Sequence, residues 1–191
     1  MKANNATKLS DEELVRKIVD KNDTHLFAIL YDRYAGLVYN KCYGFSKSKE
    51  EAQDLTHDVF VQLFVKLRMF KGKSKFSTWL YSFTYNFCVN YVQRNSDKKK
   101  EKVTVVTDVI KDEDIDEDEI DDTTLFELKS DKLAKALKMI DVEDKMILLM
   151  KYQDDMSIKE IQESLNLGAS AVKMRIKRAK ERVVKMYNQI V

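Results

Sequence analysis

Residues 157–182 constrain the fold more than any other part of the chain, because a short helical pattern, a break and a longer helical pattern follow one another there. Ser157 and Glu160 have the spacing of a capping box, which predicts the start of the first helix. The apolar face of this helix is formed by Ile158, Ile161 and Leu165. Residues 166–168 (Asn-Leu-Gly) then break the pattern with residue types that tolerate turn conformations.

The second helix of this stretch combines a narrow apolar stripe with strong positive charge. Its apolar residues recur at steps of four and three: Val172, Ile176, Ala179, Val183 and Met186. Its other faces carry Lys173, Arg175, Lys177, Arg178, Lys180 and Arg182, with Glu181 as the single acid among them. This pattern is typical of a helix-turn-helix whose second helix enters the DNA major groove. The alternative is a solvated C-terminal helix packed on a helical hairpin, and the excess of positive charge favours DNA binding.

The composition favours an all-α protein. The 191 residues include no proline and only four glycines, which is unusual for a sandwich or barrel. No segment reaches ~18 uninterrupted apolar residues, and the N-terminus has no signal-peptide core, so we expect a soluble, cytoplasmic protein without membrane insertion. Cys42 and Cys88 lack metal-ligand spacing and lie in apolar helical patterns, which predicts buried thiols in a reducing cytosol.

Charge is segregated along the chain, although the net charge is only +2. Residues 1–95 hold 15 basic and 10 acidic side chains, residues 96–130 hold 6 and 13, and residues 131–191 hold 13 and 9. Two basic blocks joined by an acidic segment predict two nucleic-acid-binding domains, 1–95 and 131–191, connected by a linker.

The first block has the pattern of a four-helix domain. Ser10 with Glu13, and Ser48 with Glu51, predict two helix starts. Helical spacing marks three apolar faces: Leu14, Val15 and Ile18; Leu26, Phe27, Leu30, Tyr31, Tyr34 and Val38; and Leu55, Val59, Phe60, Leu63, Phe64 and Leu67. These faces are large enough to bury a common core.

The fourth helix is expected over residues 77–94, after a loop that carries Lys71, Lys73 and Lys75. Its predicted inner stripe is Phe76, Leu80, Phe83, Phe87 and Tyr91, and another face carries Trp79, Asn86, Asn90 and Arg94. The tryptophan is either a core anchor or part of a surface for unpaired bases. In the second case aromatic rings stack the bases, amides bind their edges and lysines hold the phosphates.

The third helix carries Gln53, Asp54, His57 and Asp58 on the face opposite much of the core. A solvated polar face is the simple interpretation. The pair His57-Asp58 also resembles the metal dyad of some phosphohydrolases, but the chain has only one other histidine, His25. We therefore predict no metal site, no cofactor and no enzyme activity.

Residues 96–130 lose helical periodicity, and ten acids fall within the fifteen residues 108–122. Too few apolar residues remain there to offset the repulsion, so we predict a disordered or partly extended linker. After it, Leu133, Ala136, Leu137 and Ile140 predict one helix and residues 146–152 predict another. We expect the pair to cover the apolar faces of the helix-turn-helix. The acid-rich residues from Asp141 onward are favourable at a helix start.

With both domains in view, the chain resembles the extracytoplasmic-function (ECF) group of bacterial RNA polymerase sigma factors. Residues 53–60 (QDLTHDVF) are similar to the polymerase-binding helix of that group, and residues 76–80 (FSTWL) with Asn86 match a second motif. Residues 158–161 (IKEI) and 172–179 (VKMRIKRA) are similar to its helix-turn-helix. The resemblance covers roughly residues 10–95 and 130–188.

The resemblance implies an alternative sigma factor that binds core polymerase, melts the promoter and directs promoter-specific initiation. The implied polymerase contacts, against the clamp helices of the largest subunit, are Gln53, Asp54, His57, Asp58 and Phe60. The implied contacts to the downstream promoter element are Lys71, Lys73, Lys75, Phe76, Trp79, Asn86 and Asn90. Those to the upstream element are Ala169, Ser170, Ala171, Lys173, Met174, Arg175, Lys177 and Arg178.

Further partners follow from the same resemblance: the polymerase flap region, promoter DNA and an anti-sigma factor, with the protein acting at the nucleoid. The acidic linker would lie in the RNA exit path. Departures from the group's pattern are His57, Asn90, Gln162, Asn166 and Met174. Gln162 and Asn166 lie where the two helices of the helix-turn-helix approach each other, so we expect a slightly different crossing. The alternative function is a free-standing helix-turn-helix regulator that does not bind core polymerase.

Overall fold

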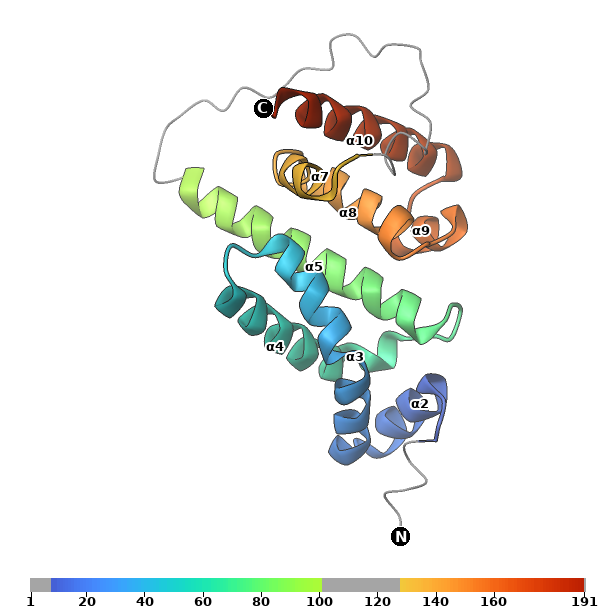
Figure 1. The fold of residues 1–191 in the computed structure, drawn as a ribbon. Helices are drawn as coiled ribbons and strands as arrows, with labels where there is room; N and C mark the ends of the chain where they lie inside the picture. Colours follow the sequence, from blue (N-terminus) through green and yellow to red (C-terminus); the bar gives the residue numbers. More distant parts are fainter. Residues whose placement is uncertain (1–7, 101–127, 191) are drawn as a thin grey trace. The chain divides into compact units, whose positions relative to one another are not determined.

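The computed structural model describes residues 8–100 and 128–190, with the side chains of residues 97–100 excepted, and every regular element in these ranges is helical (Figure 1). The predicted all-α class is therefore confirmed for the described part of the chain. The chain divides into two compact units, Met1–Asn90 and Tyr91–Val191. The acidic stretch 108–122 lies outside the described residues.

The first unit contains α2 (Asp11–Lys21), α3 (Thr24–Phe45), α4 (Lys49–Lys66), the short 3-10 helix η1 (Leu67–Met69) and most of α5 (Phe76–Lys100). Both predicted capped starts are present. The Ser10 side chain accepts from the Glu13 amide while the Glu13 carboxylate accepts from the Ser10 amide at 2.8 Å. That second bond lowers the pKa of Glu13. Ser48 caps α4 through the Glu51 amide, and Asp23 caps α3.

The core of the first unit is built mainly from the predicted apolar faces. Fully or almost fully buried residues come from all four helices, and they include Leu14, Ile18, Leu30, Val38, Leu55, Val59, Leu63 and Leu80. Fully burying one such aliphatic side chain stabilises a fold by roughly 1.5–3 kcal/mol, so this common core stabilises the unit more than any single polar contact.

Helix α5 differs from the expected element in two respects. It continues through Lys100 rather than ending near Arg94, so it extends into the segment expected to be linker. Of the predicted inner stripe only Phe76 and Leu80 are buried, whereas Phe83, Phe87 and Tyr91 are half-buried. Tyr85, Thr84, Cys88 and Val89 are buried instead. The helix carries apolar residues around most of its circumference, so periodicity alone identifies no single inner face.

The second unit contains α7 (Ser130–Ala136), α8 (Val142–Leu148), the π-helical turn η2 (Leu149–Gln153), α9 (Ile158–Leu165) and α10 (Ala169–Gln189). The helix expected over 146–152 begins earlier, directly after Asp141, and its last turn widens into the π-helix, where the Asp154 amide donates to the Leu149 carbonyl. The core of this unit includes Ala136, Ile147, Met150, Ile161, Val172, Ala179 and Val183. No helix in the described ranges is long and apolar enough to span a bilayer.

Candidate nucleic-acid interface

The helix-turn-helix is positioned by local contacts at both ends of α9. At its start, the Ser157 and Glu160 side chains form the predicted capping box. At its end, Asn166 adopts a left-handed conformation with φ 53° and ψ 47°, and its amide and that of Leu167 donate to the Gln162 carbonyl. Asparagine is one of the few residue types that visits this conformation at modest cost, so it replaces glycine without breaking the turn.

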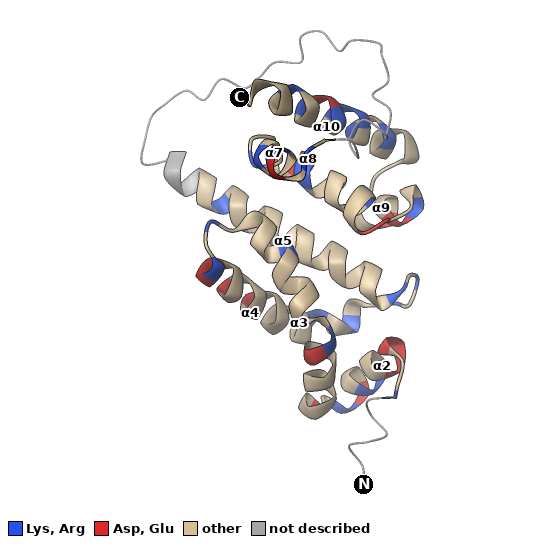
Figure 2. Ribbon diagram, viewed as in Figure 1, with Lys and Arg blue, Asp and Glu red and all other residues tan. Residues whose placement is uncertain are grey.

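The N-terminal half of α10 presents the residues expected to contact the upstream element. Ala169, Ser170, Ala171, Lys173, Met174 and Arg175 are exposed, whereas Lys177 and Arg178 are half-buried. Val172 and Ile176 alternate with them and are buried in the core of the unit. Basic residues occur along α10 in Figure 2. A helix with small exposed residues at its start and cations along its first turns has the shape and charge to enter a major groove.

Acidic residues of α8 hold α10 in place, which periodicity did not reveal. Arg182 Nη1 lies 2.6 Å from Asp144 Oδ2 and 3.9 Å from Asp141 Oδ2. Arg175 Nη1 lies 3.6 Å from Glu143 Oε2 in a solvent-exposed pair. Exposed pairs contribute little to stability, so Arg175 remains available to DNA, whereas Arg182 is a structural residue. The acids at the start of α8, interpreted from the sequence only as a helix start, thus also anchor α10.

The predicted polymerase-binding face lies on α4. Gln53, Asp54, His57 and Asp58 are exposed along it, as the pattern predicted. Phe60 differs: its side chain is only 3% exposed and its ring lies against Phe27 and Tyr31, with centroid distances of 6.3 and 4.5 Å. Phe60 belongs to the apolar face of α4 and packs in the core. It therefore helps to hold α4 in place and does not contribute to the exposed polar face.

The lysine loop between η1 and α5 is exposed at Lys71, Lys73 and Lys75. Gly72 has φ 67°, a left-handed conformation that favours glycine at this turn. Figure 2 shows the positive charge of the loop directly before α5. The loop therefore presents three cations that do not contribute to the core.

The aromatic residues after the loop form a cluster. Trp79 is half-buried and packs against Phe70, Phe76 and Phe83, with ring centroids 5.6–5.9 Å away. Phe76 is 0% exposed and so cannot stack a base, contrary to its place in the predicted DNA-contacting set. Trp79 therefore packs in the aromatic cluster and also keeps part of its side chain accessible to solvent. On the same helix, Asn86 is half-buried and Asn90 is exposed.

Sequence patterns did not identify Glu12, which helps to position the N-terminus of α5. Its carboxylate accepts a hydrogen bond from the Phe76 amide at 3.1 Å and so caps the N-terminus of α5 from a helix 64 residues earlier. A carboxylate at this place satisfies a free backbone donor and interacts favourably with the helix dipole. Only tertiary structure brings the two together.

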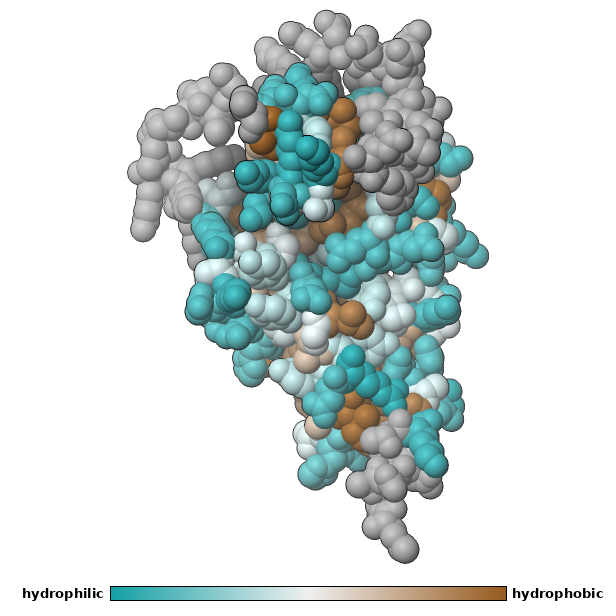
Figure 3. Space-filling view, in the orientation of Figure 1, coloured by the Kyte–Doolittle hydropathy of each residue, from teal (hydrophilic) through white to brown (hydrophobic). Residues whose placement is uncertain are grey.

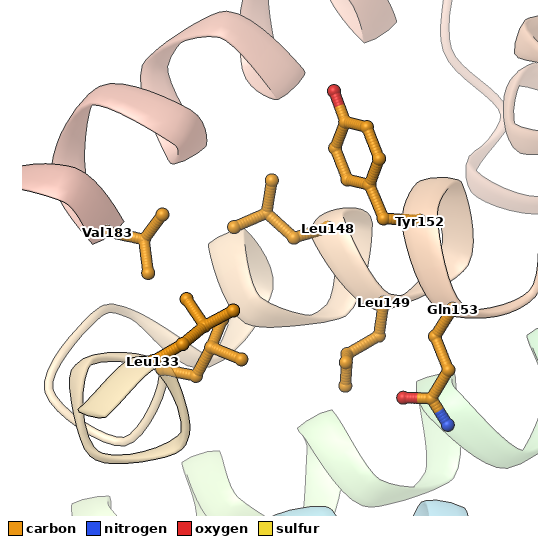
Figure 4. Close-up of a pocket in the computed structure, with 7 residues that line it drawn as sticks. Leu133, Leu148, Leu149, Tyr152, Gln153 and Val183 are labelled. Atoms are coloured by element: carbon orange, nitrogen blue, oxygen red, sulfur yellow. The ribbon is translucent and has the colours of Figure 1, made fainter. Parts of the chain in front are cut away.

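The second unit also holds an apolar pocket of about 240 Å³. It is lined by Leu133, Leu137, Leu148, Leu149, Tyr152, Gln153 and Val183, of which Leu133, Leu148 and Val183 point toward one another in Figure 4.

The face drawn in Figure 3 is mainly hydrophilic, with apolar residues in separate patches. Among the described residues, no group of three or more His, Cys, Asp or Glu side chains could hold a metal ion, and His57 is exposed on α4.

Two family models match the chain. Residues 30–98 match Sigma-70 region 2, and residues 130–183 match Sigma-70, region 4. The first match contains α4, the lysine loop and α5 except its last two residues, and the second contains the helix-turn-helix. Together they cover more than half of the chain, and each lies mostly within one of the basic blocks.

Two curated relatives are similar to the chain. The ECF RNA polymerase sigma factor SigW of Bacillus subtilis (strain 168) is 29% identical over 179 residues, which is 91% of this chain and 95% of that protein. The RNA polymerase sigma-H factor of Pseudomonas aeruginosa is 32% identical over 75 residues, 39% of this chain and 38% of that protein. The first similarity extends through both units.

Solved structures share the fold. CnrH, in complex with the cytosolic domain of CnrY, superposes with a TM-score of 0.60 at 17% identity, covering 93% of this chain and 97% of that one. The sigma factor RpoE of Bartonella quintana, in complex with the anti-sigma factor NepR, gives 0.61 at 14% identity, covering 86% and 98%. From the two family matches and the full-length similarity, we conclude that the chain belongs to the ECF group of the sigma-70 family of RNA polymerase sigma factors.

Proposed function

We propose that this protein binds core RNA polymerase and directs it to promoters of a specific sequence, acting on chromosomal DNA in the cytoplasm. One observation carries the proposal: a single chain combines a region 2 unit, with an exposed lysine loop, and a region 4 unit whose α10 presents cations at its first turns. The chemistry is recognition and melting of DNA, for which neither a metal nor a catalytic residue is required.

The face of α4 formed by Gln53, Asp54, His57 and Asp58 is proposed to contact the clamp helices of the largest polymerase subunit. These four side chains are exposed, whereas the neighbouring residues Ala52, Leu55, Thr56 and Val59 are buried. A rigid helix with a continuous polar face suits a protein partner of complementary charge, because electrostatic complementarity mainly sets specificity and association rate.

The lysine loop, Trp79, Asn86 and Asn90 are proposed to act at the downstream element. Lysines hold the phosphates of the separated strand, the accessible part of Trp79 stacks on a base, and the amides bind base edges. Stacking contributes about 1–3 kcal/mol per base, which helps to keep a strand open once it has unpaired.

The first turns of α10 are proposed to read the upstream element. Lys173 and Arg175 are exposed and Lys177 and Arg178 half-buried, so the first pair has the wider reach. Some of these cations contact only phosphate, which positions the helix without specifying sequence. The small residues 169–171 allow close approach to the bases, and exposed Met174 offers an apolar contact to a thymine methyl group.

The polymerase flap region and an anti-sigma factor are proposed as further partners of the full chain. Support for the second comes from the solved RpoE–NepR complex, in which a protein of the same fold binds an anti-sigma factor.

The proposal is tested by reconstituting the chain with core polymerase and mapping transcription starts on a set of promoters. Lys173→Ala is expected to lower upstream-element affinity about tenfold, the scale of one lost charge-assisted contact, while polymerase affinity stays unchanged. Lys185→Ala, an exposed lysine near the other end of α10, is the matched control and should change neither affinity.

Tight duplex binding by the chain alone, without any association with core polymerase, would instead indicate the free-standing regulator. Polymerase binding that fails to select start sites would also contradict the proposal.

A further inference from the structure

Two thiols meet in the core of the region 2 unit. Cys42 on α3 and Cys88 on α5 are thiols that no disulfide joins, and both are 0% exposed. Their Sγ atoms lie 3.9 Å apart, with the Cys88 thiol directed toward the Cys42 sulfur. A disulfide has an S–S bond of about 2.05 Å, so bonding requires the two sulfur atoms to approach by about 2 Å. Small side-chain rotations and a slight approach of the two helices supply such a shift.

The surroundings favour reactivity at Cys42. The hydrogen bond from the Cys88 thiol lowers the pKa of Cys42, while burial opposes this effect. The thiolate is the nucleophile in thiol oxidation, so Cys42 is the group that reacts first. Its partner already lies beside it, which is the usual arrangement of an attacking and a resolving cysteine.

We propose that Cys42 and Cys88 form a redox-modification site, which closes to a reversible intramolecular disulfide when hydrogen peroxide reaches the folded region 2 unit. The Cys42 thiolate attacks a peroxide oxygen, the O–O bond breaks, and Cys42 becomes a sulfenic acid as the first water is released after proton uptake. The Cys88 sulfur then attacks the sulfenic sulfur: the S–S bond forms, the S–O bond breaks and a second water leaves. Two thiols are oxidised by two electrons, and one peroxide is reduced to two waters.

Because both thiols are fully buried, the reaction with peroxide is slow. The peroxide reaches the sulfur atoms only when the helices open locally, so the pair reacts more slowly than an exposed thiol. The product is expected to be intramolecular, because the two sulfur atoms lie 3.9 Å apart in the core of one chain.

The disulfide would form close to α4, the helix that carries the proposed polymerase-binding face. Thr56 on α4 is among the groups that interact with Cys42, and its hydroxyl donates to the Ala52 carbonyl at 2.7 Å. Its chain neighbour His57 is exposed on that face. Drawing α3 and α5 together at this level changes the packing beneath α4. Oxidation therefore weakens polymerase binding, a consequence that rests on the proposed function.

The site itself is tested on the full-length protein by limited treatment with hydrogen peroxide, denaturation, alkylation and intact mass measurement. The expected product is a monomer that has lost two hydrogens, takes up no alkylating reagent and regains both thiols with dithiothreitol. Persistent alkylation of both cysteines, a disulfide-linked dimer or an oxygen-bearing cysteine that the reductant does not reverse would overturn the proposal.

The consequence is tested by measuring the affinity of the reduced and oxidised forms for core polymerase. We expect the oxidised form to bind about tenfold more weakly, with recovery on reduction. Cys42→Ser, treated identically, controls for methionine oxidation and should bind equally before and after peroxide; Cys88→Ser serves if that variant fails to fold. Equal affinity of reduced and disulfide forms would refute the switch, whereas failure of the reduced form to bind at all would refute the proposed function instead.

Discussion

Asp11 connects the first helix to the rest of the region 2 unit. Its carboxylate accepts from Arg33 Nη1 at 2.6 Å and from the Tyr34 hydroxyl at 2.5 Å, while Arg33 Nη2 donates to the Leu9 carbonyl at 2.9 Å. These charge-assisted bonds are partly buried, where they contribute more than surface ion pairs do. The next residue, Glu12, caps α5, so α2 positions the start of the helix that carries Trp79.

Tyr34 makes the contribution of this hydrogen-bond network to the free energy of unfolding depend on pH. Burial, and then its hydrogen bond to Asp11, raise the pKa of Tyr34 well above its ordinary value of 10.0. A raised folded-state pKa contributes stability that is fully present below the unfolded pKa and is lost as the pH rises above about 10. We expect the free energy of unfolding to fall more between about pH 8 and pH 11 in the wild type than in Tyr34→Phe. Urea unfolding at each pH measures the difference.

Tyr43→Phe, which removes the hydroxyl of an exposed tyrosine on the same helix, is the control and should keep the wild-type pH slope. An identical slope in the wild type and Tyr34→Phe would show that the phenol does not titrate differently in the folded state.

At the scale of the element, the turn of the helix-turn-helix depends on Asn166. Left-handed dihedrals cost a residue with Cβ roughly 1–2 kcal/mol, less for asparagine and almost nothing for glycine. Asn166→Ala is therefore expected to destabilise the protein by about 1 kcal/mol, whereas Asn166→Gly should be neutral or slightly stabilising. Urea unfolding distinguishes the two. Asn188→Ala, an exposed position within α10, should lie within about 0.5 kcal/mol of the wild type.

Local signals made most helices predictable. Ser10, Ser48 and Ser157 sit three residues before a glutamate, and all three open a helix, because capping needs only neighbouring residues. Helix α5 was harder, since its apolar residues surround the helix and its N-terminus is capped by Glu12 from far away in the sequence. The exposed cations of α10 and the burial of Phe60 and Phe76 followed from periodicity, whereas the family motifs, which mix core and surface residues, had placed both phenylalanines among the binding residues.

At the scale of the whole molecule, polymerase binding and DNA reading are assigned to different surfaces, which predicts separable defects. Asp54→Ala is expected to weaken binding to core polymerase about tenfold, because it removes an exposed charge from the α4 face, while upstream-element binding by the assembled complex stays sequence-specific. Titration of the chain against core polymerase measures the first effect. Glu50→Ala, at the exposed first turn of the same helix, is the control and should bind normally. Loss of both activities in Asp54→Ala with retained folding would contradict separate surfaces.

The role proposed for the lysine loop, holding the melted strand, comes after both polymerase binding and upstream-element binding. Replacing Lys71, Lys73 and Lys75 with alanine removes three exposed cations without touching the core, so polymerase binding and upstream protection should persist. The open complex should become less stable and more sensitive to salt, because fewer phosphates of the separated strand are neutralised. Permanganate reactivity of unpaired thymines, compared with upstream footprinting on the same promoter, separates the two steps. An unchanged open complex would mean that the loop does not hold the melted strand, and equal loss of upstream protection would mean that it acts before melting.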